Sequence, residues 1–573
     1  MSGSRLSSGP DVVGPKDSHV ANNHESSLPG MQELQKKLRK VVSEEFGEEV
    51  TLELTRPDEK FGDYSTNVAM QLGNKLGKNP REIAILLAGK LHDLDEVDKV
   101  EIAGPGFINI RLTDGVVLAA ATLATNLSKP LVGQEILVEF GDPNPFKRMH
   151  IGHLYSYTAG ESIARLLEAA GAKVVRLSYH GDVGLHVAKA VWGMVQAGVD
   201  PSKMPKSPTP DIGLYYQKGA ISYDEDESAK QEIDKVNDHI YKRDDPVVND
   251  LYDWGKKNSF DEFAKILDDL SVRIDQQYME SASAQKGLEL VKANIDKVFA
   301  SSQGAVVYEG EKAGLHTRVF LTSSGLPTYE AKDLGLAELK GADYPKAAHS
   351  IIITAGEQAE YFKVMLAALS EINPALAGIT RHLFHGFVNL STGKMSSRKG
   401  EVYTAIKLME AVSDEVKSVF GSENPAIEIA AIKYEFLKHR LGSDIVYDPK
   451  ESVSLAGDSG PYLQYAHARA LSVLRKAPRV SKTTTDKSDP DERSLARKIS
   501  IYPEVVAEAA KEYLPSHIAS YLYGLTQSFN SFYEKNRIIG HERQALRLEL
   551  TKNYATVLKA GLNLLGITAP EKV

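Results

Sequence analysis

Residues 143–154, which read PNPFKRMHIGHL, combine side chains that could act on a phosphate. His150 and His153 are three positions apart, so both imidazoles would lie on one face of the first turn of a helix. Imidazole N–H groups donate to phosphate oxygens, and the N-terminus of a helix attracts anions. Lys147 adds a mobile positive charge, and Gly152 has no Cβ, so a flat base could approach the backbone there. The plainer alternative is an ordinary turn that carries two surface histidines.

A second segment, residues 393–400, reads GKMSSRKG and is rich in positive charge and hydroxyl groups. A flexible, cationic loop of this kind is suited to gripping a pyrophosphate mainly in the transition state. Taken alone, the loop is better explained as a solvated basic turn, but together with the first segment it favours a phosphate site. The side chains that would do this work are Lys394, Ser396, Ser397 and Lys399.

The elements around the first segment predict a parallel sheet. Residues 136–140 form an apolar run that is typical of a buried strand, and a turn over 141–145 separates it from a helical pattern over 150–170. Gly171 ends that helix, and residues 174–178 predict the next strand. A strand, a helix and a second strand in this order favour a parallel sheet with its ligand site at the strand ends.

Composition and pattern divide the chain into four parts. Residues 1–30 are rich in Ser, Gly, Pro and Asn and predict a disordered tail. A compact α+β pattern over 31–130 predicts a small N-terminal domain. An α/β domain is expected over 131–450, with a polar, helical insertion at about 195–300. Residues 451–573 predict a helical domain.

The composition excludes several kinds of protein. Of the 573 residues, 42 % are hydrophobic and 25 % are charged, which are ordinary globular values. The chain has no cysteine, which excludes disulfides, thiol nucleophiles and cysteine-bound zinc, and it has no HExxH pattern, so we expect no dedicated metal site. No apolar run approaches the ~18 residues of a membrane span, and the N-terminus has no signal-peptide core, so we expect a cytoplasmic protein without membrane contact.

Charge is spread unevenly along the chain. The formal net charge is −9, yet residues 461–573 contain 17 lysines and arginines against 11 aspartates and glutamates. A basic block on an acidic body indicates a polyanionic partner at that end. A chance excess of positive charge on a helical surface is an equal alternative.

The two segments resemble the HIGH and KMSKS signatures of class I aminoacyl-tRNA synthetases, in the same order and at a similar separation. Further segments narrow the resemblance to arginyl-tRNA synthetases: GDYSTN at 62–67, GPGFINIRL at 104–112, TYEAKDL at 328–334, GPYLQYAHARALSVLRK at 460–476 and GLNLLGITAPEKV at 561–573. The resemblance runs from about residue 31 to the C-terminus. It implies an α/β multidomain protein with a Rossmann-like parallel-sheet catalytic domain, a small α+β N-terminal domain that binds the tRNA elbow, and an all-α C-terminal bundle that binds the anticodon.

The same resemblance implies the reaction. It is the ATP-dependent activation of L-arginine to arginyl-adenylate, followed by transfer to the 3′-terminal ribose of tRNA(Arg). The implied partners are tRNA(Arg), L-arginine and ATP with Mg²⁺, and the implied state is a monomer. A cysteinyl-tRNA synthetase would need zinc-binding cysteines, which the chain lacks, and a non-catalytic tRNA-binding paralogue would have eroded signatures, whereas both are intact here.

Residues for binding arginine also follow from the resemblance. A guanidinium has five donors in a fixed fork and is read by carboxylates in bidentate geometry. The implied set is Asn144, Glu280, Tyr329, Asp333 and Gln358. For Tyr329 and Asp333, which are four positions apart, the alternative is a surface pair on a helix. The segment 179–186, YHGDVGLH, departs from the family, which more often has an aromatic residue after Gly-Asp and a Gln near His186.

Residues for binding tRNA are implied at both ends of the chain. In the N-terminal domain, Phe107 could stack on a base of the D-loop and Asn109 could hydrogen-bond to it. In the C-terminal helices, Tyr462 and Tyr465 lie near Arg469, and aromatic and basic side chains together hold unstacked bases. The alternatives are a core strand position for Phe107 and burial in the bundle for either tyrosine.

Overall fold

The computed structural model describes residues 29–203, 211–391, 403–478 and 487–572. Most of the predicted tail therefore lies outside the described residues, and so do Lys394, Ser396, Ser397 and Lys399 of the second motif.

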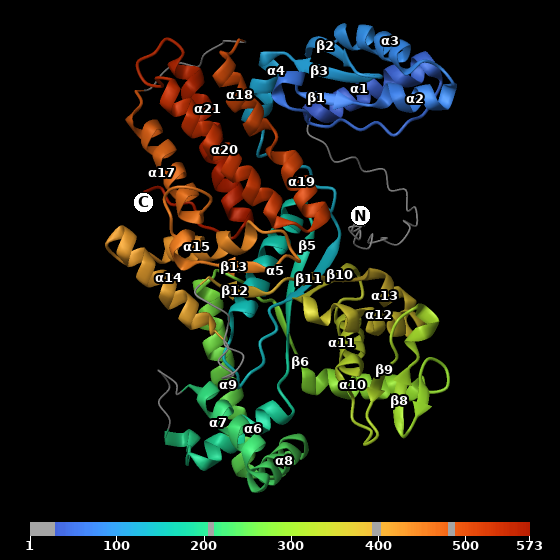
Figure 1. Cartoon of the computed structure of the whole chain (residues 1–573), viewed down its shortest axis with the longest axis vertical. Coiled ribbons are helices and arrows are strands. Elements are labelled where there is room, and N and C mark those ends of the chain that lie inside the picture. The colour runs from blue at the N-terminus through green and yellow to red at the C-terminus, as the bar shows by residue number, and fades with distance from the viewer. Residues whose placement is uncertain (1–28, 204–210, 392–402, 479–486, 573) are drawn as a thin grey trace, which may run out of the picture.

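The N-terminal domain is built on a small antiparallel sheet (Figure 1). Its strands lie in the order β1-β3-β2, and helices α1 to α4 cover the sheet. Asn79 caps α3 because its side chain accepts the backbone N–H of Arg81, and Pro80 occupies the first turn. The elements are α1 (Pro29–Phe46), β1 (Tyr64–Thr66), α2 (Val68–Leu76), α3 (Pro80–His92), β2 (Val97–Ala103), β3 (Phe107–Leu112) and α4 (Asp114–Thr122).

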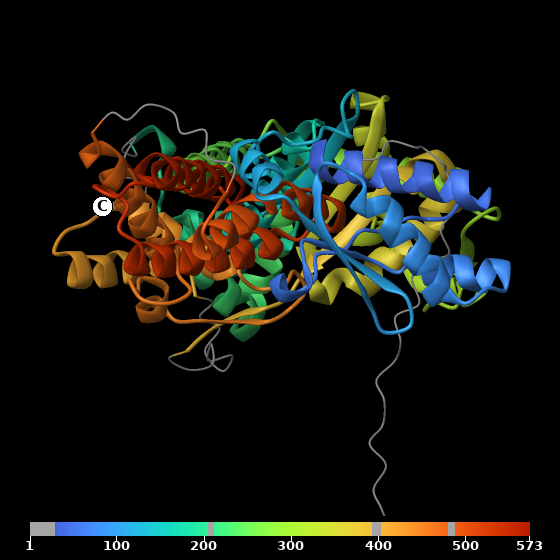
Figure 2. The same ribbon diagram turned by 90° about the horizontal axis from the view of Figure 1, so that it is seen from above.

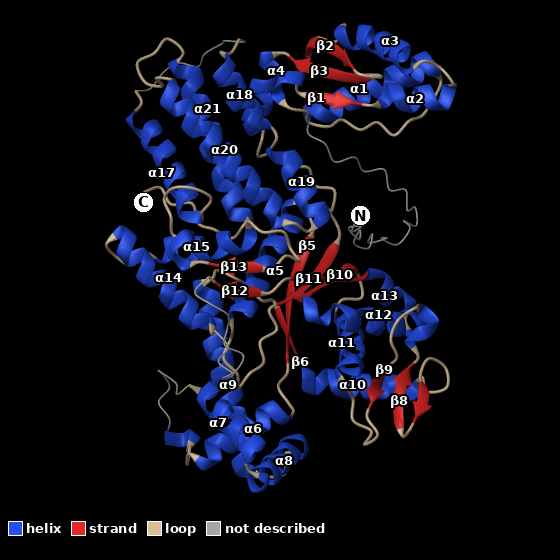
Figure 3. Ribbon diagram, viewed as in Figure 1, coloured by secondary structure: helices blue, strands red, loops and turns tan. Residues whose placement is uncertain are grey.

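The centre of the molecule is a five-stranded, fully parallel sheet, which confirms the predicted Rossmann-like fold (Figure 3). Its order, β11-β10-β4-β5-β6, places the strands β4 and β10 side by side at the point where the chain order reverses. Ligands of open α/β sheets bind beyond the carboxyl ends of the strands at this switch point. The strands are β4 (Glu135–Phe140), β5 (Lys173–His180), β6 (Gln276–Met279), β10 (Ala347–Ala355) and β11 (Thr380–His385).

The strand β6 lies inside the range 195–300, which the sequence predicted to be a helical interruption of the sheet. Its sequence, QQYM, has one buried residue, so no apolar run marks it as a strand. Helices α6 to α9 precede it and form a lobe at the far end of the molecule from the N-terminal domain. They are α6 (Leu185–Gln196), α7 (Ile212–Glu225), α8 (Glu227–Lys242) and α9 (Pro246–Asp269).

A second connection leads from β6 back to the centre of the sheet. A small antiparallel sheet of order β7-β8-β9 follows α10 in the chain and precedes α11, and α12 and α13 follow β10. These elements form a core of their own beside the parallel sheet. They are α10 (Glu280–Ala293), β7 (Ala300–Ser302), β8 (Ala305–Tyr308), β9 (Arg318–Leu321), α11 (Tyr329–Asp343), α12 (Ala359–Ile372) and α13 (Pro374–Ile379).

The C-terminal part is helical apart from the strand β13, which pairs with β12 (Val388–Leu390). One continuous apolar core joins the N-terminal domain, the helix α5 (Ile151–Ala169) and this bundle. Figure 2 shows the N-terminal domain and the bundle side by side. The elements are α14 (Ala405–Phe420), α15 (Pro425–Leu437), β13 (Ile445–Tyr447), α16 (Pro449–Ser452), α17 (Gly460–Lys476), α18 (Pro490–Ser500), α19 (Tyr502–Glu512), α20 (Pro515–Lys535) and α21 (Gln544–Leu564).

Within the described part of the chain, no helix is both long and apolar enough to cross a membrane.

Candidate functional site

The turn after β4 is tied to the carboxyl end of β5. The Asp142 Oδ1 atom accepts the backbone N–H of Tyr179 at 2.8 Å, and the Pro143 carbonyl lies 2.7 Å from the His180 Nδ1 atom. The Asn144 Oδ1 atom accepts the backbone N–H of Gly181 at 2.9 Å. The first motif therefore begins at the ligand-binding edge of the sheet, with Asn144 between two strand ends.

The same turn is strained and is held by the lobe of helices α6 to α9. Asp142 and Phe146 have φ values of 52° and 68°, which side chains other than glycine rarely adopt. The Phe146 ring is fully buried and stacks on Tyr252, and its backbone N–H donates to the Ser259 hydroxyl at 2.9 Å. Helix α9, which carries both partners, thus fixes the turn that leads into the histidine pair.

His150 and His153 form a reciprocal cap at the start of α5. The Nδ1 atom of His150 accepts the backbone N–H of Gly152 at 3.2 Å, and the Nδ1 atom of His153 accepts that of His150 at 3.1 Å. The rings stack with their centroids 3.6 Å apart. Because both Nδ1 atoms accept, the network assigns the proton of each neutral ring to Nε2. A Cβ on Gly152 would lie 3.1 Å from the His150 ring, so glycine leaves that ring room.

Both histidines are held in the neutral form. Burial, together with the neighbouring His385 and Lys147, lowers the pKa of His150 to about 4. Burial also lowers the pKa of His153 well below its ordinary value, and His150 adds to the effect. The pair therefore offers two uncharged N–H donors at neutral pH rather than two cations.

The chain that follows the second motif returns to the first one. The backbone N–H of Ile151 donates to the Tyr403 carbonyl at 3.1 Å, and the N–H of Ala405 donates to the Met149 carbonyl at 2.8 Å. On the other side of the undescribed segment, the Ser391 hydroxyl donates to Asp448 at 2.7 Å. Lys394, Ser396, Ser397 and Lys399 lie between these two fixed ends, outside the described residues.

Three acidic side chains, Glu139, Glu280 and Asp333, lie near Tyr179 of β5 and form an acidic cluster. Glu139 is paired with Lys340 at 2.9 Å, and Glu280 is paired with Lys332. The Asp333 carboxylate has no hydrogen-bonding or ion-pairing partner among the described residues. Burial and the nearby Glu139 raise the pKa of Asp333 well above its ordinary value, while Lys340 opposes the shift. Among the described residues, the acidic cluster thus has one carboxylate without a direct ion-pair partner.

Gly181 lets Asn144 and Glu280 approach each other. A Cβ on Gly181 would lie 2.6 Å from the Asn144 Oδ1 atom and 3.2 Å from the Glu280 Oε2 atom. A side chain at this position would therefore force Asn144 to move and would crowd Glu280. Burial also raises the pKa of Glu280, and the ion pair with Lys332 opposes that shift.

Asp182 fixes the start of α10, next to Glu280, a role that the sequence did not predict. Its buried carboxylate accepts from Lys256 at 2.7 Å, from the Ser281 N–H at 2.9 Å and from the Tyr252 hydroxyl at 3.1 Å. Ser281 follows Glu280 at the start of α10. Only the Gly-Asp pair in YHGDVGLH could have drawn attention to this residue, because its partners lie far along the chain.

Three predicted residues stand apart from the acidic cluster. Tyr329 begins α11 and is 69 % exposed, with the Lys332 ammonium 5.0 Å from its ring centroid. Gln358 is exposed in the turn after β10. The Lys147 ammonium lies 4.9 Å from the Tyr216 ring, and burial lowers its pKa. The structure shows no hydrogen bond from these three side chains to the acidic cluster of Glu139, Glu280 and Asp333.

The N-terminal candidates differ in exposure. Phe107 begins β3 and is 42 % exposed, so it is not the core residue that the alternative required. Asn109 is only 8 % exposed and lies in the middle strand, opposite Ser65 and Glu101.

The C-terminal candidates divide in the same way. Tyr465 is 40 % exposed, and the Arg469 guanidinium lies 5.0 Å from its ring centroid. Tyr462 is half-buried, packs against Tyr523 and accepts a hydrogen bond from Asn530 at 2.8 Å, which makes it a bundle residue. Tyr465 and Arg469 line a cleft of about 890 Å³ together with Arg475, Lys476, Tyr533 and Arg537.

Tyr533 and Arg537 were missed by sequence reasoning. They follow from no motif, because α20 and the loop after it reach the cleft only in the folded bundle.

No group of three or more histidines, aspartates or glutamates suited to a metal ion occurs among the described residues.

Three protein-family models match successive parts of the chain. Residues 31–112 match the arginyl tRNA synthetase N terminal domain, and residues 118–447 match the catalytic domain of the class I (R) tRNA synthetases. Residues 463–573 match the DALR anticodon binding domain.

Whole-chain comparisons give the same result. The arginine–tRNA ligase of Limosilactobacillus fermentum is 31 % identical over 571 residues, covering 95 % of this chain and 99 % of the relative. That of Flavobacterium psychrophilum is 29 % identical, with 88 % and 89 % covered. The solved arginyl-tRNA synthetase of Thermus thermophilus superposes with a TM-score of 0.79 at 26 % identity, covering 95 % of this chain and 100 % of that one. The Plasmodium falciparum structure, at 20 % identity and a TM-score of 0.76, covers 95 % and 99 % and supports the fold.

Proposed function

The chain belongs to the arginyl-tRNA synthetase family, and from this premise we infer that it is an ATP-dependent arginine–tRNA ligase. A carboxylate oxygen of arginine attacks the α-phosphorus of ATP, and pyrophosphate leaves. The arginyl group then passes from the adenylate to the 3′-terminal ribose of tRNA(Arg). Members of this class achieve such steps mainly by positioning the reactants and stabilising charge.

One observation supports arginine as the amino acid. The Asp333 carboxylate lies unpaired in the acidic cluster, where burial and the neighbouring acids raise its pKa, so a cation that binds there would remove an electrostatic penalty. A guanidinium remains charged at all relevant pH values and can meet a carboxylate through two parallel hydrogen bonds. We assign Asp333 to the guanidinium, and Glu280 and Asn144 to the ammonium end of the same substrate. Tyr329 and Gln358 would complete the arginine-binding site at its edge.

The histidine pair supports binding of the ATP phosphates. Two neutral Nε2–H donors at the start of α5 would meet phosphate oxygens without the repulsion that two buried imidazolium ions would suffer. Gly152 would lie against the adenosine part. Lys394 and Lys399, with Ser396 and Ser397, would close on the leaving pyrophosphate. The pairing of residues 403–405 with the start of α5 supports this proposal, because it holds one end of that loop at the phosphate site. Lys147 is the alternative cation.

Mg²⁺ would enter with the nucleotide. The described residues offer no metal-binding cluster, so ATP oxygens rather than a protein cage would supply most of its ligands. When bound, the ion would neutralise phosphate charge.

The cleft around Tyr465 and Arg469 is our candidate for the anticodon. Aromatic faces and guanidinium groups hold unstacked bases and phosphates together. Phe107, with Asn109 beside it, is our candidate for the tRNA elbow, and its exposure supports stacking on a base. A monomeric state and a cytoplasmic location stay predictions.

The test is a charging assay of the purified chain with tRNA, ATP, Mg²⁺ and each amino acid in turn. We expect radiolabel to enter tRNA with arginine alone, and arginine-dependent ATP–pyrophosphate exchange to need tRNA. Charging with another amino acid, or binding of tRNA without any charging, would contradict the proposed function.

A further inference from the structure

We propose that Asp63 is a positioning residue that fixes the N-terminal domain against helix α18 of the bundle, so that the two candidate RNA-binding faces are held at one separation. The proposal rests on the proposed function, because it concerns how a single tRNA is gripped at two points. Asp63 lies in the GDYSTN segment, to which the site described above gives no role.

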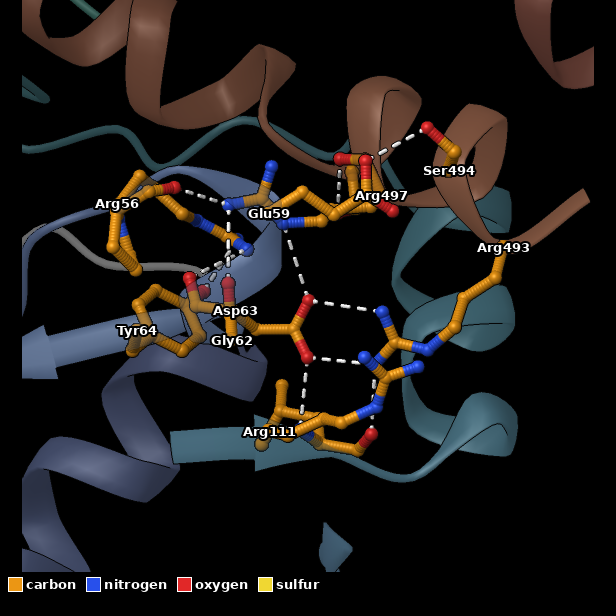
Figure 4. A network of polar contacts seen from close by, with 12 residues as sticks. Arg56, Glu59, Gly62, Asp63, Tyr64, Arg111, Arg493, Ser494 and Arg497 are labelled. Atoms are coloured by element: carbon orange, nitrogen blue, oxygen red, sulfur yellow. Dashed lines mark hydrogen bonds and ion pairs between the residues drawn. The ribbon is translucent and has the colours of Figure 1, made fainter. Parts of the chain in front are cut away.

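Asp63 is fully buried where the two domains meet (Figure 4). Its Oδ2 atom accepts from Arg493 of α18 at 2.7 Å and from the backbone N–H of Leu112 at 2.8 Å. The Arg497 Nε atom lies 3.3 Å from its Oδ1 atom. A single carboxylate therefore joins the end of β3 to two arginines of another domain.

The surrounding contacts are polar and converge on the same helix. Arg493 also donates to Asp114 at 2.8 Å, and Arg497 donates to the Pro57 carbonyl at 2.8 Å. Beside them, Arg56 pairs with Glu504 of α19 at 2.7 Å. Contacts between domains of one chain are mobile by default unless the interface is large and apolar. Here the continuous apolar core also crosses the interface, and the buried charges add directed contacts to it.

Removing the charge of Asp63 would turn this attraction into repulsion. Arg497 already has a pKa held below its ordinary value by burial and by the charges of Arg56 and Arg493. Without Asp63, Arg493 would keep Asp114, but Arg497 would lose its central counter-charge. Both guanidinium groups of α18 would then lose their shared partner in the N-terminal domain, and Arg56 of that domain would repel Arg497 without the compensating charge.

Helix α18 is itself tied to the basic cleft. Glu492, next to Arg493, is fully buried and accepts from Arg547 at 2.8 Å. Arg547 also donates to the carbonyl of Arg537, a residue that lines the cleft, at 2.8 Å. A hydrogen-bonded chain thus runs from the cleft through α18 to Asp63 and on to β3, whose first residue is the exposed Phe107.

The consequence is a gain in affinity for a partner that spans both faces. When two contact points are held at the correct separation, the second contact forms at high effective concentration. If the N-terminal domain were loosened, this gain in affinity would be lost, although the residues of each RNA-binding face would be unchanged. An RNA that contacts only the cleft would bind with unchanged affinity.

The test compares full-length tRNA(Arg) with a hairpin of its anticodon stem and loop. We expect Asp63→Asn to weaken full-length tRNA about tenfold or more, through KM for tRNA rather than kcat, and to leave hairpin and arginine affinity unchanged. The matched control is Asp98→Asn, which removes the same charge from an exposed pair with Arg111 in the same domain and should change neither affinity.

Each other outcome has a definite meaning. Unchanged affinity for full-length tRNA in folded Asp63→Asn, or an equal loss for the hairpin, would overturn the proposal. If Asp63→Asn does not fold, Glu504→Gln, which weakens the more exposed pair with Arg56, must show the same selective loss for full-length tRNA. Failure of the unaltered chain to bind either RNA would instead overturn the proposed function, and the positioning role with it.

Discussion

At the residue scale, the environment of a side chain decides its role more than its type does. His150 and His153 could be selected from the sequence by their spacing, but their neutral state and the proton on Nε2 follow from burial and from two backbone N–H groups. No sequence pattern indicates that burial or those two hydrogen bonds. Asp182 likewise could not be predicted, because its partners Lys256 and Ser281 come from distant parts of the chain.

A pH profile tests the neutral histidine pair. Because burial lowers the pKa of His150 to about 4, we expect no histidine ionisation near pH 6.5 in kcat/KM for ATP between pH 5.5 and 8. His150→Asn should lower kcat about 10²- to 10³-fold at every pH in that range, since a phosphate-facing donor is lost or misplaced. An acid limb near pH 6.5 that disappears in His150→Asn would show that the charged form matters.

At the element scale, strong patterns predicted the fold well. The apolar run that became β4, the helix α5 and the strand β5 were all predicted, because each combines a regular pattern with a clear end signal. The short strand β6 was not, because two of its four residues are exposed glutamines and only its neighbour β5 makes it a strand. The partly polar, domain-bridging contacts of α18 also had no local signal.

Helix α15 provides a stability test. Lys433 is buried and donates to the Gly566 carbonyl at 2.8 Å, which joins α15 to the end of α21. Burial, with Arg165 nearby, lowers the pKa of Lys433 to about 7. Between pH 7 and the ordinary lysine value, the unfolded chain binds the extra proton, so stability should rise with pH. One full proton is worth about 1.4 kcal/mol per pH unit.

We therefore expect Lys433→Met to remove a slope of about 1 kcal/mol per pH unit from the free energy of unfolding between pH 8 and 9. Urea denaturation at several pH values measures this. The control is Lys417→Met, an exposed lysine whose pKa is raised by Glu423 and which stays protonated in this range. An identical slope in Lys433→Met and the unaltered chain would mean that Lys433 remains charged in the folded protein.

At the scale of the whole molecule, an acidic protein must bind RNA through local positive faces. The net charge of −9 and the basic cleft around Arg469 together predict binding that weakens steeply with salt. The uneven charge was visible in the sequence, but the cleft was not, because Tyr533 and Arg537 join it from another helix and loop.

We expect Arg469→Glu to weaken tRNA binding and to make the dependence of log Kd on log salt concentration shallower, because phosphate contacts are lost. Arginine and ATP affinity should not change. Lys511→Glu makes the same charge change at an exposed site on α19 and serves as the control. If Arg469→Glu and Lys511→Glu behave alike, net charge rather than the cleft governs binding.

We propose that this molecule selects arginine by the positive charge of its guanidinium group, through the unpaired carboxylate of Asp333. The most direct measurement is the ratio of kcat/KM for arginine to that for citrulline, a neutral analogue of nearly the same shape, in the charging reaction. Loss of one partner of a buried charged pair costs roughly 2–5 kcal/mol, so Asp333→Asn should lower this ratio about 30-fold or more. The control is Asp343→Asn, which changes a residue of the same helix that accepts a hydrogen bond from Tyr278. It should leave this ratio unchanged. An unchanged ratio in folded Asp333→Asn would contradict the account.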